Sequence, residues 1–191
     1  MAKTDPEAVK REKRKNIQWV ITIFLMTILI SGAISLISDA VMETSGIVVA
    51  FCILMGIIFL GILFDIVGMA VATAEEKPFH SMAARKVPGA QEAIRLLRNA
   101  ERVSSICNDV VGDICGVVSG SASATIAALV LTSVQVAWPS GLSLLMSALV
   151  AGLTVGGKAI GKTIAVKSST QIVHLVGRVI HSISRVSKKK K

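Results

Sequence analysis

The sequence predicts an all-α membrane protein with four transmembrane helices, a cytoplasmic amphipathic connector helix and a C-terminal juxtamembrane amphipathic helix. The 191-residue chain is 52% hydrophobic and only 17% charged, with a mean hydropathy of +0.69, which is too apolar for a soluble domain of this length. Its uncharged runs reach the roughly 20 residues that a helix needs to cross a bilayer. Lysine and arginine are concentrated in the segments between and around these runs.

The spans are set by uninterrupted apolar runs. Residues 16–38 carry no charge and include Trp19, a residue typical of the membrane interface. The next run contains one charge, Asp65, and a further uncharged run at 114–157 is long enough for two spans separated at Trp138-Pro139. The predicted segments are a basic leader at 1–15, spans at 16–38, 46–74, 106–136 and 142–164, an interface helix at 168–186 and a polybasic tail at 187–191.

Two segments have amphipathic helical spacing. After Pro88-Gly89, apolar positions recur through Val103, which predicts one amphipathic helix. We interpret it as a connector lying on the cytoplasmic membrane surface in preference to a partner-binding helix. The second segment, 168–186, has an apolar stripe opposed by polar residues, and the tail that follows it is expected to attract anionic lipid headgroups.

The distribution of charge predicts the topology and excludes several function classes. All 21 lysines and arginines fall on the side of both termini and the middle loop, so the positive-inside rule makes that side the cytoplasm of a bacterial-type plasma membrane. The chain has no tyrosine and two tryptophans, so its net charge of +9 does not indicate a nucleic-acid partner. Three isolated cysteines indicate neither disulfides nor a zinc site. We find no nucleophile–base pattern, so neither an enzyme nor a cofactor is predicted.

Acidic residues inside the spans are the main functional signal. Asp109 and Asp113 are four residues apart and therefore share one helix face. Asp65 lies on the preceding, antiparallel span, and a rise of about 1.5 Å per residue puts Asp65 and Asp113 at a similar depth, roughly 10 to 14 Å inside. Charged groups at that depth are expensive and by default suggest an ion site. With the Asn108 amide, these oxygens favour a hard cation such as Mg²⁺, so Asp65, Asp109, Asp113 and Asn108 are the predicted ligands or gate.

Two lysines and a row of glycines leave alternatives open. Lys158 and Lys162 on the fourth span are expected near the level of Asp65 and Asp113, as a gate or as ion-pair partners. An Asp113–Lys158 pair would suit a non-transporting scaffold or accessory subunit. Gly112, Gly116 and Gly120 form a ridge on which another helix can pack. The serines among them allow a hydroxyl-lined path as an equal alternative.

Residues 156–163 match the G-x-x-x-x-G-K-[ST] phosphate-loop pattern. That motif works as a loop after a strand of a parallel sheet, whereas here a helix-length apolar run precedes it. We therefore set nucleotide binding aside as a third alternative. His80, His174 and His181 form no predicted ligand pair.

From about Gly61 to Ile183 the chain resembles the transmembrane domain of the cyclin M and CorC (CorB-like) magnesium transporter family. Three segments carry the resemblance: the connector from Gly89 to Arg102, similar to R-A-x-x-x-L-x-L-L-x-N-P-E-R; residues 157–162, similar to G-E-x-x-P-K; and the stripe after Lys167. The family's pattern S-x-F-F-S-x-S-E-x-A falls on residues 61–70, with Asp65 at a serine position.

The resemblance implies a homodimer of three-span units that hold Mg²⁺ with serine and asparagine side chains, matched here over residues 46–186. It also implies that the family's polar pair on the next helix falls on Asp109 and Asp113, after a two-residue shift of register. In this chain carboxylates replace neutral ligands, Lys158 replaces a glutamate, and the CBS domains and the C-terminal domain have no counterpart. The additional first helix at 16–38 has none in the family.

Overall fold

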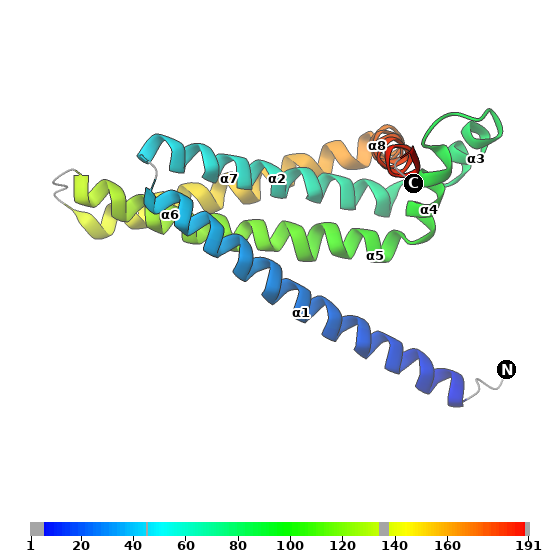
Figure 1. The fold of residues 1–191 in the computed structure, drawn as a ribbon, viewed down its shortest axis with the longest axis horizontal. Coiled ribbons are helices and arrows are strands. Elements are labelled where there is room, and N and C mark those ends of the chain that lie inside the picture. The colour runs from blue at the N-terminus through cyan, green and yellow to red at the C-terminus, as the bar shows by residue number, and fades with distance from the viewer. Residues whose placement is uncertain (1–5, 45, 134–137, 190–191) are drawn as a thin grey trace.

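The computed structural model describes residues 6–44, 46–133 and 138–189, and all secondary structure in these ranges is helical (Figure 1). Within them, four helices are long and apolar enough to cross a membrane, which confirms the predicted fold class. The first candidate span, Ile17–Ser38, is part of α1 (Pro6–Thr44), and the second is α2 (Ile47–Thr73). The third runs through α5 (Ala100–Ser105), the π-helix η1 (Ile106–Gly112) and α6 (Asp113–Ser133), and the fourth is α7 (Pro139–Lys167).

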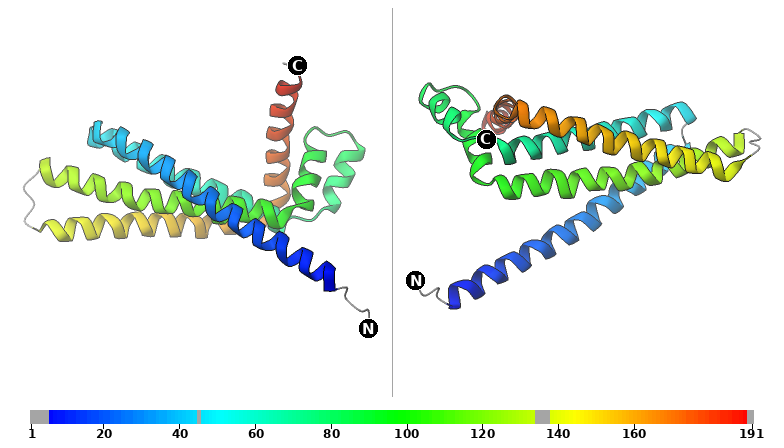
Figure 2. Two further views of the ribbon diagram at one scale, coloured as in Figure 1. Left: turned by 60° about the horizontal axis from the view of Figure 1, so that its bottom comes forward. Right: turned by 180° about the vertical axis from the view of Figure 1, so that it is seen from behind.

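Three of the spans form a close bundle, and α1 crosses it obliquely (Figures 1 and 2). The N-terminal part of α1 diverges from the bundle, whereas its later part lies against α6 and α2. The short helices α3 (Lys77–Ala84) and α4 (Ala90–Arg98) and the amphipathic α8 (Ser169–Lys189) lie at the bundle end toward which the N-terminal end of α1 points. Helix α8 runs across the bundle direction, as an interface helix does (Figure 2).

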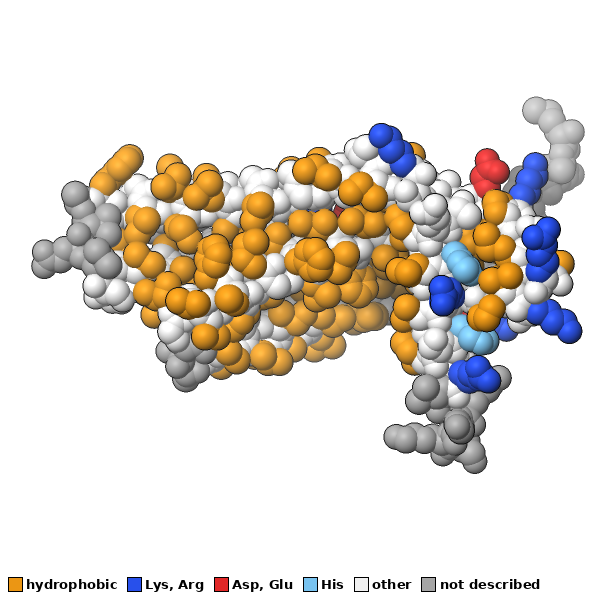
Figure 3. All heavy atoms as spheres, turned by 90° about the horizontal axis from the view of Figure 1, so that it is seen from above, with side chains coloured by type: hydrophobic (Ala, Val, Ile, Leu, Met, Phe, Trp, Pro, Cys, Tyr) orange, Lys and Arg blue, Asp and Glu red, His pale blue; other side chains and the backbone are white. Residues whose placement is uncertain are grey.

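One part of the bundle interior is a small apolar cluster, and the exterior of the bundle is also apolar. Leu54 and Ile58 of α2 pack with Ile126 of α6 and Val150 of α7. Large aliphatic side chains cover the outside of the spans, as the band of hydrophobic atoms in Figure 3 shows. An apolar surface of this extent is stable only against lipid, because monomeric soluble proteins rarely expose apolar patches larger than a few hundred Å².

Glycines set the helix spacing. A Cβ atom on Gly61 of α2 would lie 2.8 Å from the Cβ of Cys115 on the third span. On α7, Gly161 lies so close to Ile66 that an added Cβ would be 2.7 Å from its Cγ1, and Gly157 makes a similar contact one turn earlier. Small residues four apart allow such close approach between helices.

The observed helix ends correct several predicted boundaries. Helix α1 begins at Pro6, so much of the predicted leader is helical, and α8 continues to Lys189, into the predicted tail. The predicted connector helix is broken at Asn99, whose φ of −117° separates α4 from α5, and the third span begins at Ala100 instead of 106. Helix α7 begins at Pro139 because proline is well tolerated in a first helical turn. The predicted end of the third span at 136 and the last tail residues, 190–191, lie outside the described residues.

At the bundle end, α8 packs on α4 through two glycines. Gly89, with φ of +88°, precedes α4, and a Cβ there would lie 2.7 Å from the Cα of Arg178 on α8. Gly177 faces it so closely that a Cβ would collide with the Gly89 carbonyl oxygen. This backbone contact holds the loop before α4 directly against the middle of α8.

Candidate ion site between the second span, the third span and α7

Asp65 is the one acidic residue of the bundle that is buried in the described part of the chain. It lies on α2, in an otherwise apolar span, and its side chain and backbone together are 4% exposed. Its Oδ2 atom is shielded and has no hydrogen-bond partner in the described part of the chain. A buried carboxylate oxygen without a partner is costly, which suggests a ligand or a functional role.

Lys158 and Asp65 approach the same backbone position on the third span. The Lys158 ammonium donates to the Gly112 carbonyl oxygen over 3.2 Å. A Cβ atom on Gly112 would lie 3.4 Å from Lys158 Nζ and 3.9 Å from Asp65 Oδ1. The absence of a side chain at Gly112 therefore lets an acid from α2 and a base from α7 lie beside the same residue of η1.

Asn108 fills a notch on α2 one turn from Asp65. An added Cβ on Gly68 would lie 2.8 Å from Asn108 Cγ and 2.9 Å from the Cβ of Cys107. The Asn108 amide donates to Ser104 Oγ over 3.3 Å, whereas its Oδ1 is shielded and has no partner among the described residues. Gly68 and Gly112 thus each accommodate a polar side chain from the opposite helix.

The π-helical segment η1 supplies the backbone part of the site. It spans Ile106–Gly112 and includes both Asn108 and Gly112. Each backbone hydrogen bond of a π-helix spans one more residue than in an α-helix, and such segments are frequent at functional sites. Widening the turn changes the backbone hydrogen bonding, and here the Gly112 carbonyl accepts from a side chain of another helix.

The other two predicted acids lie at the edge of this arrangement. The Asp113 side chain is 70% exposed, and its Oδ1 is 3.5 Å from Lys158 Nζ. Asp109 is exposed and accepts a 2.7 Å hydrogen bond from Ser105 Oγ on its own span. Asp65, Asn108 and the Gly112 carbonyl form a polar layer, which we call the layer at Asp65. Lys158 lies between this layer and the outer carboxylate of Asp113.

The described residues hold no cluster of three or more His, Cys, Asp or Glu side chains that could bind a metal. The structure thus places Asp65 and Asn108 at the α2–η1 contact and leaves Asp109 and Asp113 outside it. Lys162, one turn beyond Lys158, is exposed. The assignment of Asp65, Asp109, Asp113 and Asn108 as metal ligands stays a prediction.

The glycine ridge is used only in part. Gly112 is buried at the site, but a Cβ on Gly116 or Gly120 would meet nothing within 4 Å. Within the described part of the chain, no helix packs closely on these two glycines. The hydroxyls of Ser119 and Ser123 donate to carbonyl oxygens of their own helix, at 2.9 and 2.8 Å.

The residues matching the phosphate-loop pattern lie within α7. Positions 156–163 are continuously helical there, and the described residues contain no strand to precede them. Gly157 and Gly161 instead form the close contact with α2. The sequence analysis missed that this G-x-x-x-G spacing indicates close helix packing. It also missed the contact at Gly68 and the contact at the Gly112 carbonyl.

Together these features define a multi-pass α-helical membrane protein with a polar layer enclosed by three of its spans. Comparison of the chain with protein-family models, with curated proteins and with solved structures finds no match to any of them.

Proposed function

We propose that this protein transports a cation across the plasma membrane through the layer at Asp65, with Mg²⁺ as the first ion to test. The observation that carries the proposal is the buried Asp65 carboxylate, whose Oδ2 has no partner in the described chain. The shielded Asn108 Oδ1 and the Gly112 carbonyl add neutral oxygens nearby. Carboxylate, amide and carbonyl oxygens suit hard divalent cations, and the sequence resemblance to magnesium transporters favours the same ion.

The charges of the layer support a cation-binding role. Lys158 is the one ammonium within 4.0 Å of Asp113 in the described residues, and the same ammonium lies beside Gly112 near Asp65. A single ammonium thus pairs with one carboxylate, that of Asp113, and shares the neighbourhood of Gly112 with a second, that of Asp65. In the proposed cycle a cation enters beside Asp65 and displaces the Lys158 ammonium from the Gly112 carbonyl, while the ammonium keeps its ion pair with Asp113. Like charges in a low-dielectric layer repel strongly, so the lysine and the cation alternate.

The proposed topology has both termini and the loop between α2 and the third span in the cytoplasm. The N-terminal end of α1, α3, α4 and α8 lie at one end of the bundle, where the basic segments gather. A homodimer is proposed with the exposed ridge at Gly116 and Gly120 as its contact, because small residues at this spacing let helices approach closely in lipid. The dimer would cover Asp109 and Asp113, which a single chain leaves exposed.

Flux into proteoliposomes tests the transport proposal. We expect wild-type protein to move Mg²⁺, with Mn²⁺ and Co²⁺ as competitors, and Asp65→Asn to lower the rate by at least about tenfold, equivalent to about 1.4 kcal/mol. Asp113→Asn should also impair flux. The matched control is Glu101→Gln, which removes an exposed acid at the start of the third span. Full Mg²⁺ flux in Asp65→Asn, with the variant inserted normally, would contradict the ligand role.

A second candidate, a non-transporting scaffold or accessory subunit, is favoured by the 3.5 Å Asp113–Lys158 ion pair. In this case the pair joins α6 to α7 and serves assembly alone. Reversing both charges, with Asp113→Lys and Lys158→Asp, should then restore folding that each single change impairs. Recovery of folding without any cation flux in the wild type would favour the scaffold over the transporter.

A further inference from the structure

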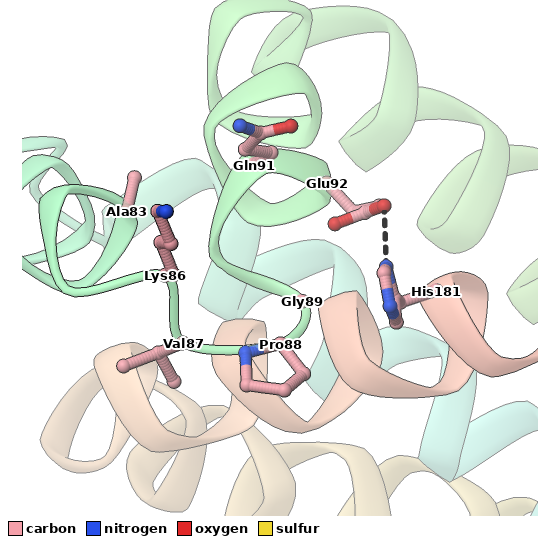
Figure 4. Close-up of a pocket in the computed structure, with 8 residues that line it drawn as sticks. All are labelled: Ala83, Lys86, Val87, Pro88, Gly89, Gln91, Glu92 and His181. Carbon is pink, nitrogen blue, oxygen red and sulfur yellow. Dashed lines mark hydrogen bonds and ion pairs between the residues drawn. The ribbon is translucent and has the colours of Figure 1, made fainter.

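A cavity lies where the loop before α4 meets α8, at the end of the bundle. It has a volume of about 330 Å³, and its walls come from Val87 and Pro88 on the loop and from one face of α8. A second cavity of about 240 Å³ shares Val87, Pro88 and His181 and extends toward Lys86 (Figure 4). The two cavities adjoin at these three shared residues, and we refer to them together as the groove.

The α8 wall of the larger cavity is a stripe of basic side chains. His174, Arg178, His181 and Arg185 follow one another at spacings of four, three and four residues, so they lie on one face of the helix. None of the described residues that line this cavity is acidic. Arg178 and Arg185 have no ion-pair partner among the described residues, and the His174 Nε2 is shielded with no hydrogen-bond partner there.

The acid nearest this stripe is already engaged. Glu92 of α4 accepts a 2.9 Å hydrogen bond from His181 Nδ1, and Figure 4 shows this contact beside Gly89 and Pro88. The two arginines are therefore left for a ligand from outside. Two guanidinium groups, each with several donors in a planar fork, match the oxygens of a phosphate group.

The groove is built on a direct backbone contact, which favours a preformed site. The contact of Gly89 with Gly177 brings the loop backbone against α8 and so keeps the loop beside Arg178. A preformed site loses less conformational entropy when it binds a ligand. An arginine pair on a mobile tail would lack this advantage.

The surroundings of the groove match the membrane interface. Leu175, Val179 and Ile183 form a second stripe on α8 and are 62%, 52% and 64% exposed. Figure 3 shows basic and histidine side chains gathered at the end of the apolar band that covers the spans. An amphipathic helix with this arrangement lies at the level of the lipid headgroups, where phosphate groups are abundant.

We propose that the groove between the loop at Val87–Pro88 and α8 binds a phosphate group, held by Arg178 and Arg185. The phosphate is that of an anionic phospholipid headgroup or free inorganic phosphate. This site is distinct from the layer at Asp65, and it is independent of whether the protein transports a cation. It also differs from general attraction of a polybasic tail to a charged surface, because it has a defined cavity and defined side chains.

The test uses the full-length protein in an uncharged detergent with two probes. Native mass spectrometry counts phosphatidylglycerol molecules retained by the protein, and calorimetry measures the binding of inorganic phosphate. We expect the double variant Arg178→Gln, Arg185→Gln to bind about tenfold more weakly than wild type, since two charge-assisted contacts are lost. The double variant Arg178→Lys, Arg185→Lys keeps the charge but not the fork, and should lie between them.

The matched control removes the same charge elsewhere. Lys77→Gln with Lys167→Gln changes two exposed lysines that line neither cavity, and its affinity should stay within about twofold of wild type. Retention of phosphatidylglycerol without phosphate binding assigns the site to the headgroup, whereas comparable binding of both assigns it to phosphate itself. Binding of neither probe to wild type, or an equal loss in the control, would overturn the proposal. Unchanged circular dichroism of the variants confirms that they fold.

Discussion

The notch at Gly68 allows a quantitative test of how the site is built. Replacement by alanine puts a Cβ 2.8 Å from Asn108 Cγ and 2.9 Å from the Cβ of Cys107, where unstrained contacts are about 3.5 to 4.0 Å. The Cys107 atom is next to the backbone, so η1 must move as a unit. Overpacking of this kind costs about 1–3 kcal/mol, partly offset by the gain of about 1 kcal/mol when alanine replaces glycine in a helix.

The same helix provides its own control. A Cβ on Gly56 of α2 would meet nothing within 4 Å, so Gly56→Ala should retain the full helix gain of about 1 kcal/mol. The two variants should therefore differ by about 1–3 kcal/mol in the free energy of unfolding, measured by titration with a denaturing detergent in mixed micelles. A Gly68→Ala protein as stable as Gly56→Ala would refute the close contact between α2 and η1.

Two further predictions concern the contact between α4 and α8. The hydrogen bond from His181, with Arg95 nearby, holds the pKa of Glu92 below its ordinary value of 4.5. The stabilisation is therefore present above that ordinary value and is lost as the pH falls through the lowered one. The protection factors of the α8 amides, which correct for the pH dependence of intrinsic exchange, should fall in this acidic range in wild type but show no such transition in Glu92→Gln. Gly89→Ala forces alanine into the left-handed region at φ +88° and against the Arg178 backbone, so it should raise α8 exchange at every pH, by about tenfold or more.

The spans could be predicted because hydropathy and length depend on composition alone. The predicted second span at 46–74 and the observed α2, Ile47–Thr73, agree closely, since Gly46 and Ala74 flank it with extended backbone. Helix ends beyond the bilayer were less predictable. Polar residues continue a helix readily once it has formed, and so α1 extends back to Pro6 through a charged segment.

The layer at Asp65 was predictable in outline but not in detail. A rise of 1.5 Å per residue suffices to bring Asp65 and Asp113 to one level. It does not tell which side of the helix each residue occupies, because the π-helical turn at η1 shifts the angular position of every residue that follows. Asp113 consequently lies exposed beside Lys158 while Asp65 is buried.

The break at Asn99 was also missed, since the apolar spacing continues across it. Asn99 donates its side-chain amide to the Arg95 carbonyl over 2.9 Å. Asparagine bonds its local backbone in this way and so competes with helix continuation. A period of apolar residues describes which face is buried, but it does not report such a local interruption.

The length of α1 has a mechanical consequence. Its 39 residues extend about 58 Å, roughly twice the thickness of the hydrocarbon core, without an interruption between the described ends. A guanidinium–indole contact at 5.2 Å, between Arg102 and Trp19, joins it to the start of the third span near the membrane surface. Helix α1 therefore has no hinge in its described length, so a tilt imposed on its outer arm is carried along the helix to its contact with α6 and α2.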